Sequence, residues 1–133
     1  MKIHHKIGAV IIRNKKLLMC RKEGEPHFIL PGGRPEGNET PEQALARELK
    51  EELGVKLVSS KFHKTYEAVH FRDKDTIVRM DVYFADFEGK PKAHGEIAEF
   101  KWVDSNYKKR GIRIASINED YTIPELKRKR LIV

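Results

Sequence analysis

The chain is poor in cysteine and has no long apolar run. Cys20 is the only cysteine among the 133 residues, so neither an internal disulfide nor a zinc site made of thiolates can form. The most apolar stretch, residues 9–12, is far too short to cross a bilayer, and no segment of the signal-peptide type follows Met1. These absences lead us to expect a cytoplasmic, reducing setting and no membrane partner.

The composition excludes several other classes of protein. Apolar residues make up 39% and charged residues 35% of the chain, which is typical of a globular protein with a strongly solvated surface. Collagen-like, low-complexity and disordered chains are excluded on this basis. A chain of 133 residues is long enough to bury one core, so we expect a single domain over residues 1–133.

The net charge of +7 is spread unevenly along the chain. Residues 101–133 contain nine basic and four acidic side chains, whereas residues 33–55 contain six acidic and three basic ones. An acidic segment in a basic protein suggests metal cations bound beside a polyanionic substrate. A solvated surface with an ordinary basic tail is the alternative, because net charge informs association rather than fold.

Strand patterns outnumber helical patterns. Strands are predicted over residues 4–13, 16–22, 27–30, 56–69, 76–87 and 97–103, and weaker helices over residues 104–110 and 123–130. The strongest helix is predicted over residues 40–53, where Thr40 is a good N-cap, Gln43 completes a capping box and Gly54 is a good terminator. The pattern indicates a mixed α/β domain with few helices.

The predicted helix carries an acidic face. Glu48, Glu51 and Glu52 share one arc of the helix, beside an apolar arc that includes Leu45 and Leu49. Like charges at these spacings destabilise a helix by roughly a few tenths of a kcal/mol per pair, a cost that a bound divalent cation would offset. Carboxylates without histidine or cysteine suit Mg²⁺ or Mn²⁺ rather than Zn²⁺. The alternative is a solvated acidic face.

A glycine turn and an acidic loop precede this helix. Pro31, Gly32 and Gly33 supply backbone that can approach a ligand closely, so Gly33 is a candidate substrate contact.

Residues 33–55 resemble the Nudix box: Gly, five residues, Glu, seven residues, Arg-Glu, aliphatic, any, Glu-Glu, any, Gly, aliphatic. The named positions are filled by Gly33, Glu39, Arg47, Glu48, Leu49, Glu51, Glu52, Gly54 and Val55. A chance match is on the order of 10⁻⁹ to 10⁻¹⁰ per starting position.

The resemblance implies a member of the Nudix hydrolase superfamily, similar to small single-domain MutT-like proteins. It implies an α/β fold, an α/β/α sandwich with a mixed β-sheet, in which the box forms a loop-helix-loop. Such enzymes cleave the pyrophosphate bond of a nucleoside diphosphate linked to another group. Water attacks phosphorus, with Mg²⁺ as the cofactor or Mn²⁺ in its place.

The resemblance also implies roles for single residues. The expected metal ligands are Glu48, Glu51, Glu52 and the carbonyl of Gly32. Arg47 and Glu39 usually brace the glutamates and the loop. The general base varies within the family, and is either the residue matching Glu48 or a glutamate from a distant loop. Glu96 is the candidate for that outside carboxylate, as base or as metal ligand, with Glu99 as its rival; a plain surface acid is the alternative for both.

Substrate contacts are harder to assign. Arg21 and Lys22 end a predicted strand next to the glycine turn and are candidates to hold a phosphate, with ordinary strand-end charges as the alternative. The aromatic residues that could stack on a base, or belong to the core, are Phe28, Tyr66, Phe71 and Tyr83. Of these we retain Phe28 as the substrate-binding candidate.

The small size and short flanks favour a MutT-like nucleoside triphosphate pyrophosphohydrolase. A pyrophosphatase for ADP-ribose, nucleotide sugars or dinucleoside polyphosphates is the second hypothesis. A Nudix module that binds a nucleotide or RNA is the third, although the complete set of acidic ligands argues against a pure binder. A nucleotide is thus the expected partner, and RNA and a second copy of the chain are left open.

Overall fold

Strands are the predominant regular secondary structure of the computed structural model, which describes residues 1–70 and 72–133. The strands are β1 (Lys2–Val10), β2 (Ile12–Arg13), β3 (Lys16–Lys22), β4 (Phe28–Ile29), β5 (Gly32–Gly33), β6 (Lys56–Val69), β7 (Thr76–Glu88) and β8 (Ile97–Val103). The helices are α1 (Pro41–Leu53), the π-helical turn η1 (Asn118–Thr122) and α2 (Ile123–Arg128). None of the helices in the described residues is long and apolar enough to cross a membrane.

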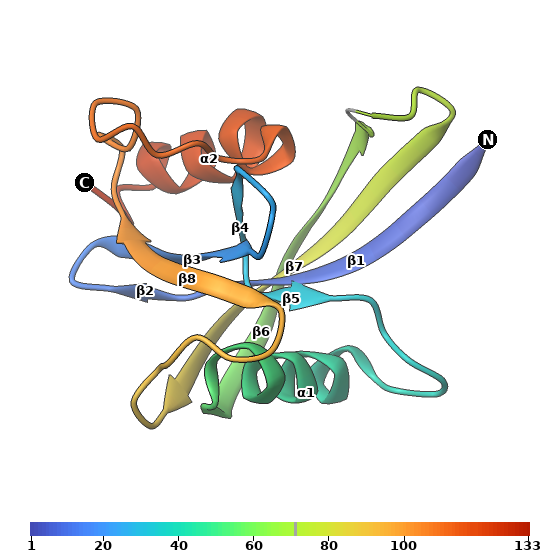
Figure 1. The fold of residues 1–133 in the computed structure, drawn as a ribbon, viewed down its shortest axis with the longest axis horizontal. Helices are drawn as coiled ribbons and strands as arrows, with labels where there is room; N and C mark the ends of the chain where they lie inside the picture. The colour runs from blue at the N-terminus through green and yellow to red at the C-terminus, as the bar shows by residue number, and fades with distance from the viewer. Residues whose placement is uncertain (71) are drawn as a thin grey trace.

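The strands form two sheets, and both lie between α1 and α2. One sheet has the order β5-β1-β7-β6, with β1 and β7 parallel and the other pairs antiparallel. In the other, β3 pairs with β2, β4 and β8, all antiparallel. Helix α1 covers one side of this assembly and α2 the opposite side (Figure 1). The predicted α/β/α sandwich with a mixed sheet is therefore confirmed.

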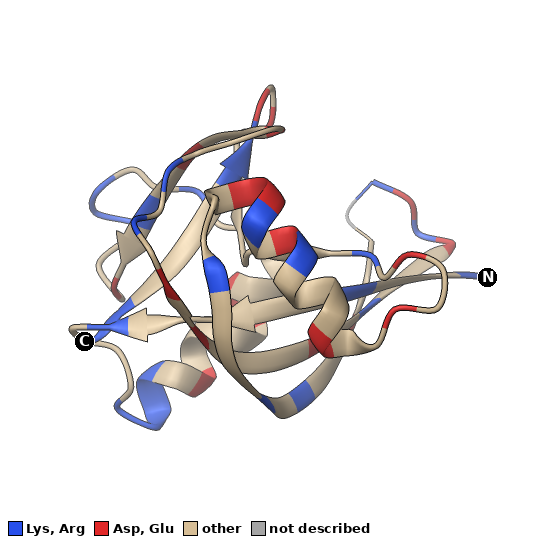
Figure 2. Cartoon of the chain, turned by 90° about the horizontal axis from the view of Figure 1, so that it is seen from below, with Lys and Arg blue, Asp and Glu red and all other residues tan. Residues whose placement is uncertain are grey.

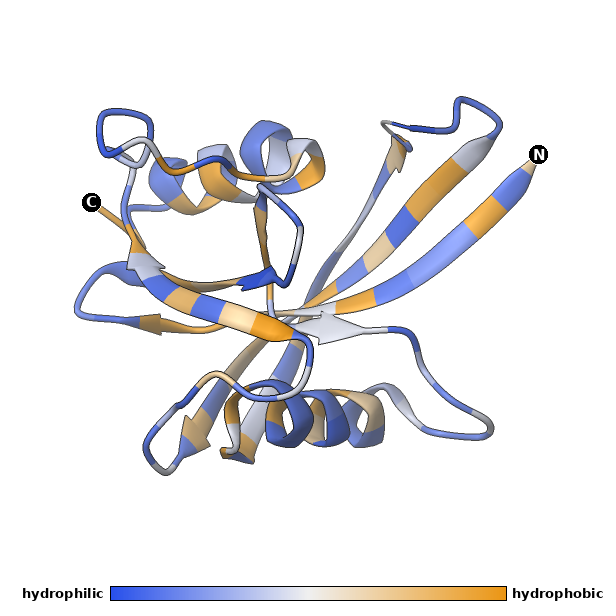
Figure 3. Cartoon of the chain, viewed as in Figure 1, coloured by the Kyte–Doolittle hydropathy of each residue, from blue (hydrophilic) through white to orange (hydrophobic). Residues whose placement is uncertain are grey.

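The two sides of the sandwich are specified by alternation along the strands. In β3, Leu18 and Cys20 pack into the apolar cluster that includes the buried face of α1, whereas Leu17 and Met19 pack into the cluster that includes α2. All four side chains are fully buried. Figure 3 shows hydrophobic and hydrophilic residues interspersed along the strands, and the buried hydrophobic residues belong to these two layers. Burial of each such aliphatic side chain contributes about 1.5–3 kcal/mol to folding.

Helix α1 forms as its end signals predict. The Thr40 hydroxyl accepts a hydrogen bond of 3.2 Å from the backbone N–H of Gln43. In return, the side-chain oxygen of Gln43 accepts one of 2.9 Å from the backbone N–H of Thr40. Gly54 ends the helix in the left-handed conformation, with φ of 66°. The predicted capping box and terminator are confirmed, and they fix where the acidic face begins and ends.

Two predictions about local structure need correction, and one element was not predicted. Residues 104–110 are not helical: Tyr107 and Arg110 each donate their amide to the carbonyl three residues before them, which makes consecutive turns. The strand predicted over residues 4–13 is divided at Ile11, because the chain passes there from one sheet to the other. The π-helical turn η1 before α2 was not predicted.

A buried charged cluster fastens α2 to β6. The Glu125 carboxylate is 8% exposed and accepts hydrogen bonds from the Tyr66 hydroxyl and, at 3.0 Å, from Lys64 Nζ. Arg128 lies 3.5 Å from the same carboxylate and His63 lies 3.8 Å from it. Hydrogen bonding from Tyr66 and then Lys64 lowers the pKa of Glu125 from 4.5 to about 2.

We expect Glu125→Gln to lower the free energy of unfolding at pH 7 by about 1–3 kcal/mol, because it removes a hydrogen-bonded buried charge. The folded-state pKa lies below the unfolded value, so the carboxylate stabilises the fold fully above pH 4.5 and loses this effect as the pH falls toward about 2. Urea unfolding at pH 7 and pH 3 should therefore show a smaller difference from wild type at the lower pH. Glu88→Gln, in an exposed position, is the matched control; an equal cost at both pH values would contradict the assignment.

Candidate active site

The glycine turn lies directly between β1 and the acidic face of α1. Gly32 and Gly33 form β5, which pairs with Gly8 and Ile7 of β1. Gly32 has φ of 139°, and a Cβ there would lie 2.0 Å from the Ile7 carbonyl oxygen, so only glycine fits. A Cβ on Gly33 would lie 2.7 Å from Oε1 of Glu48. The turn thus sets how closely the backbone approaches the helix carboxylates.

Two of the three predicted carboxylate ligands are sheltered from solvent. Glu52 is 7% exposed, and its Oε1 accepts a hydrogen bond of 2.9 Å from the Gly32 amide. Burial raises the pKa of Glu52 to about 8, because the charged form loses its hydration. Burial also raises the pKa of Glu48, against the opposing effect of the Arg47 guanidinium. Glu51 is exposed on the same side of the helix.

Arg47 holds the loop and the acidic face together. Its guanidinium forms a bidentate pair with Glu39, with N–O distances of 2.8 and 3.0 Å. It also donates to Glu48 Oε1 at 2.8 Å and to Glu51 Oε2 at 3.3 Å. A further hydrogen bond of 3.0 Å reaches the backbone carbonyl of Arg34. The planar fork of arginine suits such multiple contacts, so Arg47 orients both carboxylates and the glycine loop.

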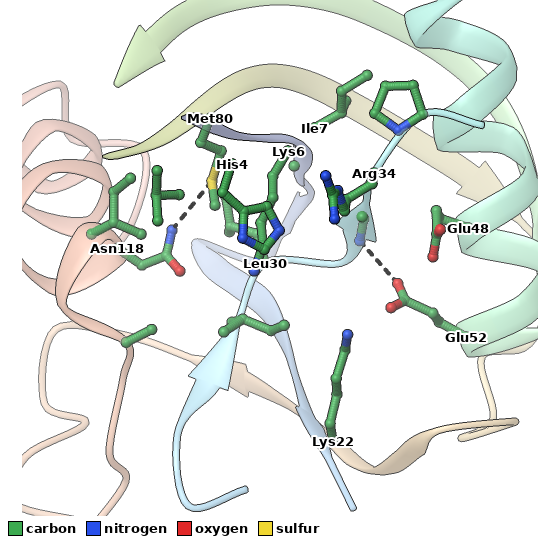
Figure 4. Close-up of a pocket in the computed structure, with 18 of the residues that line it drawn as sticks. His4, Lys6, Ile7, Lys22, Leu30, Arg34, Glu48, Glu52, Met80 and Asn118 are labelled. Carbon is green, nitrogen blue, oxygen red and sulfur yellow. Dashed lines mark hydrogen bonds between the residues drawn. The ribbon is translucent and has the colours of Figure 1, made fainter. Parts of the chain in front are cut away.

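The acidic face opens into a cavity of about 960 Å³. Glu48 and Glu52 lie at one end of this pocket and Asn118 lies at the other (Figure 4). Lys22 and Arg34 lie between the two ends, on opposite walls (Figure 4). The pocket therefore has an acidic end, a cationic middle and an end formed by a buried amide beside apolar side chains.

The far end of the pocket contains a residue that sequence reasoning missed. Asn118 is fully buried, and its Nδ2 donates to the Thr122 hydroxyl at 3.2 Å and lies 3.9 Å from Met80 Sδ. Its Oδ1 is buried and has no hydrogen-bond partner among the described residues. In the sequence, Asn118 is a single amide side chain next to Ile117, in a segment that otherwise forms core. Such a signal is too weak to predict a substrate contact.

The structure separates the other candidate residues. Lys22 and Glu96 both border the pocket, with 3.6 Å between Nζ and Oε2, and Glu96 is an exposed side chain. Arg21 and Glu99 pair at 3.6 Å and border a different cavity. Phe28 is a buried core residue that borders that second cavity and not the acidic pocket.

The remaining aromatic candidates do not border the acidic pocket either. Tyr66 is buried in the apolar cluster on the α2 side and Tyr83 in the cluster on the α1 side. Phe71 lies outside the described residues. The described residues that line the pocket include aliphatic side chains, Met80, Asn118 and the imidazole rings of His4 and His70.

The donor set fits a hard divalent cation. The three glutamates and Gly32 line one pocket wall, and oxygen ligands suit Mg²⁺. Figure 2 shows α1 with acidic residues in red and basic residues in blue, interspersed along the side of the helix that faces the viewer. Burial disfavours the charged forms of Glu48 and Glu52, and a cation beside them would offset that cost. Within the part of the chain that the structure describes, no three histidine, cysteine, aspartate or glutamate side chains form a closed cluster, and Arg47 contacts Glu48 and Glu51.

Comparison with known proteins gives the family. The sequence profile of the NUDIX domain matches residues 2–107. The chain is 34% identical to an 8-oxo-dGTP diphosphatase of Haemophilus influenzae over 107 residues, 75% of this chain and 76% of that protein. A match to an 8-oxo-dGTP diphosphatase of Proteus vulgaris is 38% identical over 58 residues, 41% of this chain and only 52% of that protein.

The fold agrees with a solved structure. The crystal structure of a MutT NUDIX hydrolase from Burkholderia pseudomallei superposes with a TM-score of 0.68 and 25% identity, covering 77% of this chain and 83% of that one. The chain therefore belongs to the NUDIX domain family. It is a small Nudix hydrolase of the pyrophosphohydrolase class, as the sequence predicted.

We expect Arg47→Lys to slow pyrophosphate-bond hydrolysis, assayed with added Mg²⁺, by about 10- to 100-fold, because a lysine cannot contact Glu39, Glu48 and Glu51 together. The Mg²⁺ dependence of pyrophosphate-bond hydrolysis measures the effect. Arg79→Lys is the matched control, since Arg79 pairs with Glu67 in an exposed position. An unchanged Mg²⁺ dependence in Arg47→Lys would contradict the positioning role.

Proposed function

We propose that the protein is a Mg²⁺-dependent nucleoside triphosphate pyrophosphohydrolase that releases a nucleoside monophosphate and pyrophosphate. One observation carries the proposal: a single pocket is lined both by the acidic face of α1 and by Asn118, whose buried amide oxygen has no hydrogen-bond partner among the described residues. A nucleoside triphosphate has the matching order of groups, with phosphates that need cations at one end and a polar base at the other. The names of the relatives from Haemophilus influenzae and Proteus vulgaris support this substrate class.

The acidic end is suited to hold the metal and the reacting phosphates. Glu48, Glu51 and Glu52, with the Gly32 carbonyl, would hold Mg²⁺. When bound there, Mg²⁺ neutralises charge on the pyrophosphate and makes the phosphorus atom more electrophilic toward water. Lys22 and Arg34 border the next part of the pocket, where their charges would attract the phosphate chain.

A carboxylate is also needed to take a proton from the attacking water. Glu48 and Glu96 both border the pocket and are candidates for this general base. Glu48 is held in place by Arg47, whereas Glu96 is exposed on a loop beside Lys22. Glu99 borders the other cavity and is less well placed.

The far end of the pocket is suited to select a base. Leu30, Val78 and Met80 supply apolar walls, and the Asn118 amide supplies hydrogen-bonding groups at the bottom. The Oδ1 atom can accept a hydrogen bond from a base N–H. A buried polar group that only the correct substrate satisfies discriminates strongly against the others.

We expect hydrolysis of nucleoside triphosphates with Mg²⁺ to release pyrophosphate rather than inorganic phosphate, and Glu52→Gln to lower turnover by orders of magnitude. Glutamine lacks the charge that holds the cation, yet it keeps an oxygen for the Gly32 amide, so folding stability should not fall. Separate assays of pyrophosphate and phosphate on triphosphates, ADP-ribose, nucleotide sugars and dinucleoside polyphosphates test the proposal.

The control for this experiment is Glu42→Gln, which changes an exposed glutamate in the first turn of the same helix. It should retain wild-type turnover. Near-normal turnover of Glu52→Gln would exclude its assignment as a metal ligand. Cleavage confined to ADP-ribose or nucleotide sugars would reject the triphosphate proposal.

We expect Asn118→Leu to lower kcat/KM for the preferred triphosphate by roughly 10- to 100-fold and to reduce the difference between bases, because the amide can no longer hydrogen-bond the base. Steady-state kinetics with the four common bases and an oxidised purine measure this effect. Asn106→Leu, at an exposed position outside the pocket, serves as the control. An unchanged base preference in Asn118→Leu would show that the base binds elsewhere.

A further inference from the structure

A third cavity, distinct from the one bordered by Arg21 and Phe28, adjoins the middle of the active-site pocket. It has a volume of about 400 Å³ and is called the annex below. The annex and the active-site pocket share lining residues, so they are two compartments of one space. The shared residues are Lys6, Lys22, Ile29, His70, Ala115 and Ser116.

The annex adjoins the part of the active-site pocket that lies between its two ends. Lys6 and Lys22, which line both compartments, lie between Asn118 at one end and Glu52 at the other (Figure 4). A nucleotide with its phosphates at the acidic end and its base beside Asn118 has its sugar at this level. A substituent on the sugar would therefore enter the annex.

The walls of the annex favour an anion. Its acidic side chains are already engaged, because Glu25 pairs with Arg72 at 3.0 Å and Glu119 accepts a hydrogen bond from the Tyr107 hydroxyl at 2.8 Å. Lys6 is only partly exposed, and among the described residues no carboxylate lies within ion-pair distance of its ammonium group. Burial and then the charge of Lys22 lower the pKa of Lys6, which a bound anion would counteract.

We propose that the annex binds a phosphate group esterified to the sugar of the substrate nucleotide, with Lys6 as the residue that selects for it. The proposal rests on the proposed function, because it takes the orientation of the nucleotide from the metal end and the Asn118 end. It adds a substrate class: nucleoside 5′-triphosphates that carry a second phosphate on the ribose. Lys6 contacts this group and takes no part in cleavage of the anhydride.

Two sources have this chemistry. One is a free nucleoside 5′-triphosphate with a 3′-phosphate. The other is the 5′-triphosphate end of an RNA, where the first internucleotide phosphate is attached to the 3′-oxygen. Both place a phosphate on the ribose, and a matched substrate series distinguishes them.

The first experiment compares kcat/KM for guanosine 5′-triphosphate, its 3′-phosphate derivative and a 5′-triphosphorylated dinucleotide. The wild type should prefer the compounds with a ribose phosphate, and Lys6→Met should reduce this preference by about 10-fold or more. Lys6→Arg should retain it, and Lys90→Met, at an exposed position away from both cavities, should not change it. Preference for the 3′-phosphate derivative over the dinucleotide would support the free nucleotide as the source, and the reverse order would support RNA.

The second experiment does not depend on catalysis. Calorimetric titration in EDTA compares guanosine 3′,5′-bisphosphate with guanosine 5′-monophosphate on wild type, Lys6→Met and Lys6→Arg. Tighter binding of the bisphosphate that is lost in Lys6→Met and kept in Lys6→Arg supports the annex, even if plain triphosphates are not hydrolysed and the proposed function fails. Hydrolysis of plain triphosphates with equal binding of both compounds would overturn the annex and leave the proposed function intact.

Discussion

The contact between the glycine turn and the acidic face of α1 determines the geometry of the whole site. The Gly32 amide holds Glu52, and the missing side chain of Gly33 leaves room for Glu48. Pairing of β5 with β1 fixes the turn to the central sheet, so the carboxylates are positioned against the strands and not only along their own helix. Arg47 completes the arrangement by joining the helix to the loop.

The sandwich makes this contact rigid. Consecutive residues of β3 pack alternately into the α1 layer and the α2 layer, so neither helix can shift without disturbing a packed core. On the opposite side, the Glu125 cluster fastens α2 to β6, and η1 precedes α2 directly. Asn118, at the start of η1, is fully buried and is thereby held within the same packed structure.

The charge pattern of the chain acquires a meaning only in the folded protein. The acidic segment becomes one end of the pocket, but the cations in its middle come from β1, β3 and the loop after β5, not from the basic final third. Lys6, Lys22 and Arg34 are far apart in the sequence and are brought to one cavity because β1 pairs with β5 and β3 ends, at Lys22, beside the same cavity. Net charge by segment therefore located the acidic end of the pocket and gave no information about its cationic middle.

The sequence by itself determined the helix α1, its caps and the family, because capping residues, helical spacing and the Nudix-box pattern are local properties. It also determined the strands β3, β6 and β8, whose bounds match the predicted ranges, since their apolar residues are contiguous or alternate along the chain. Only the tertiary structure decided that Phe28 belongs to the core, that Arg21 borders a different cavity and that Asn118 closes the pocket. These assignments depend on which face of each strand meets which layer and on contacts between residues distant in sequence, which no local pattern specifies.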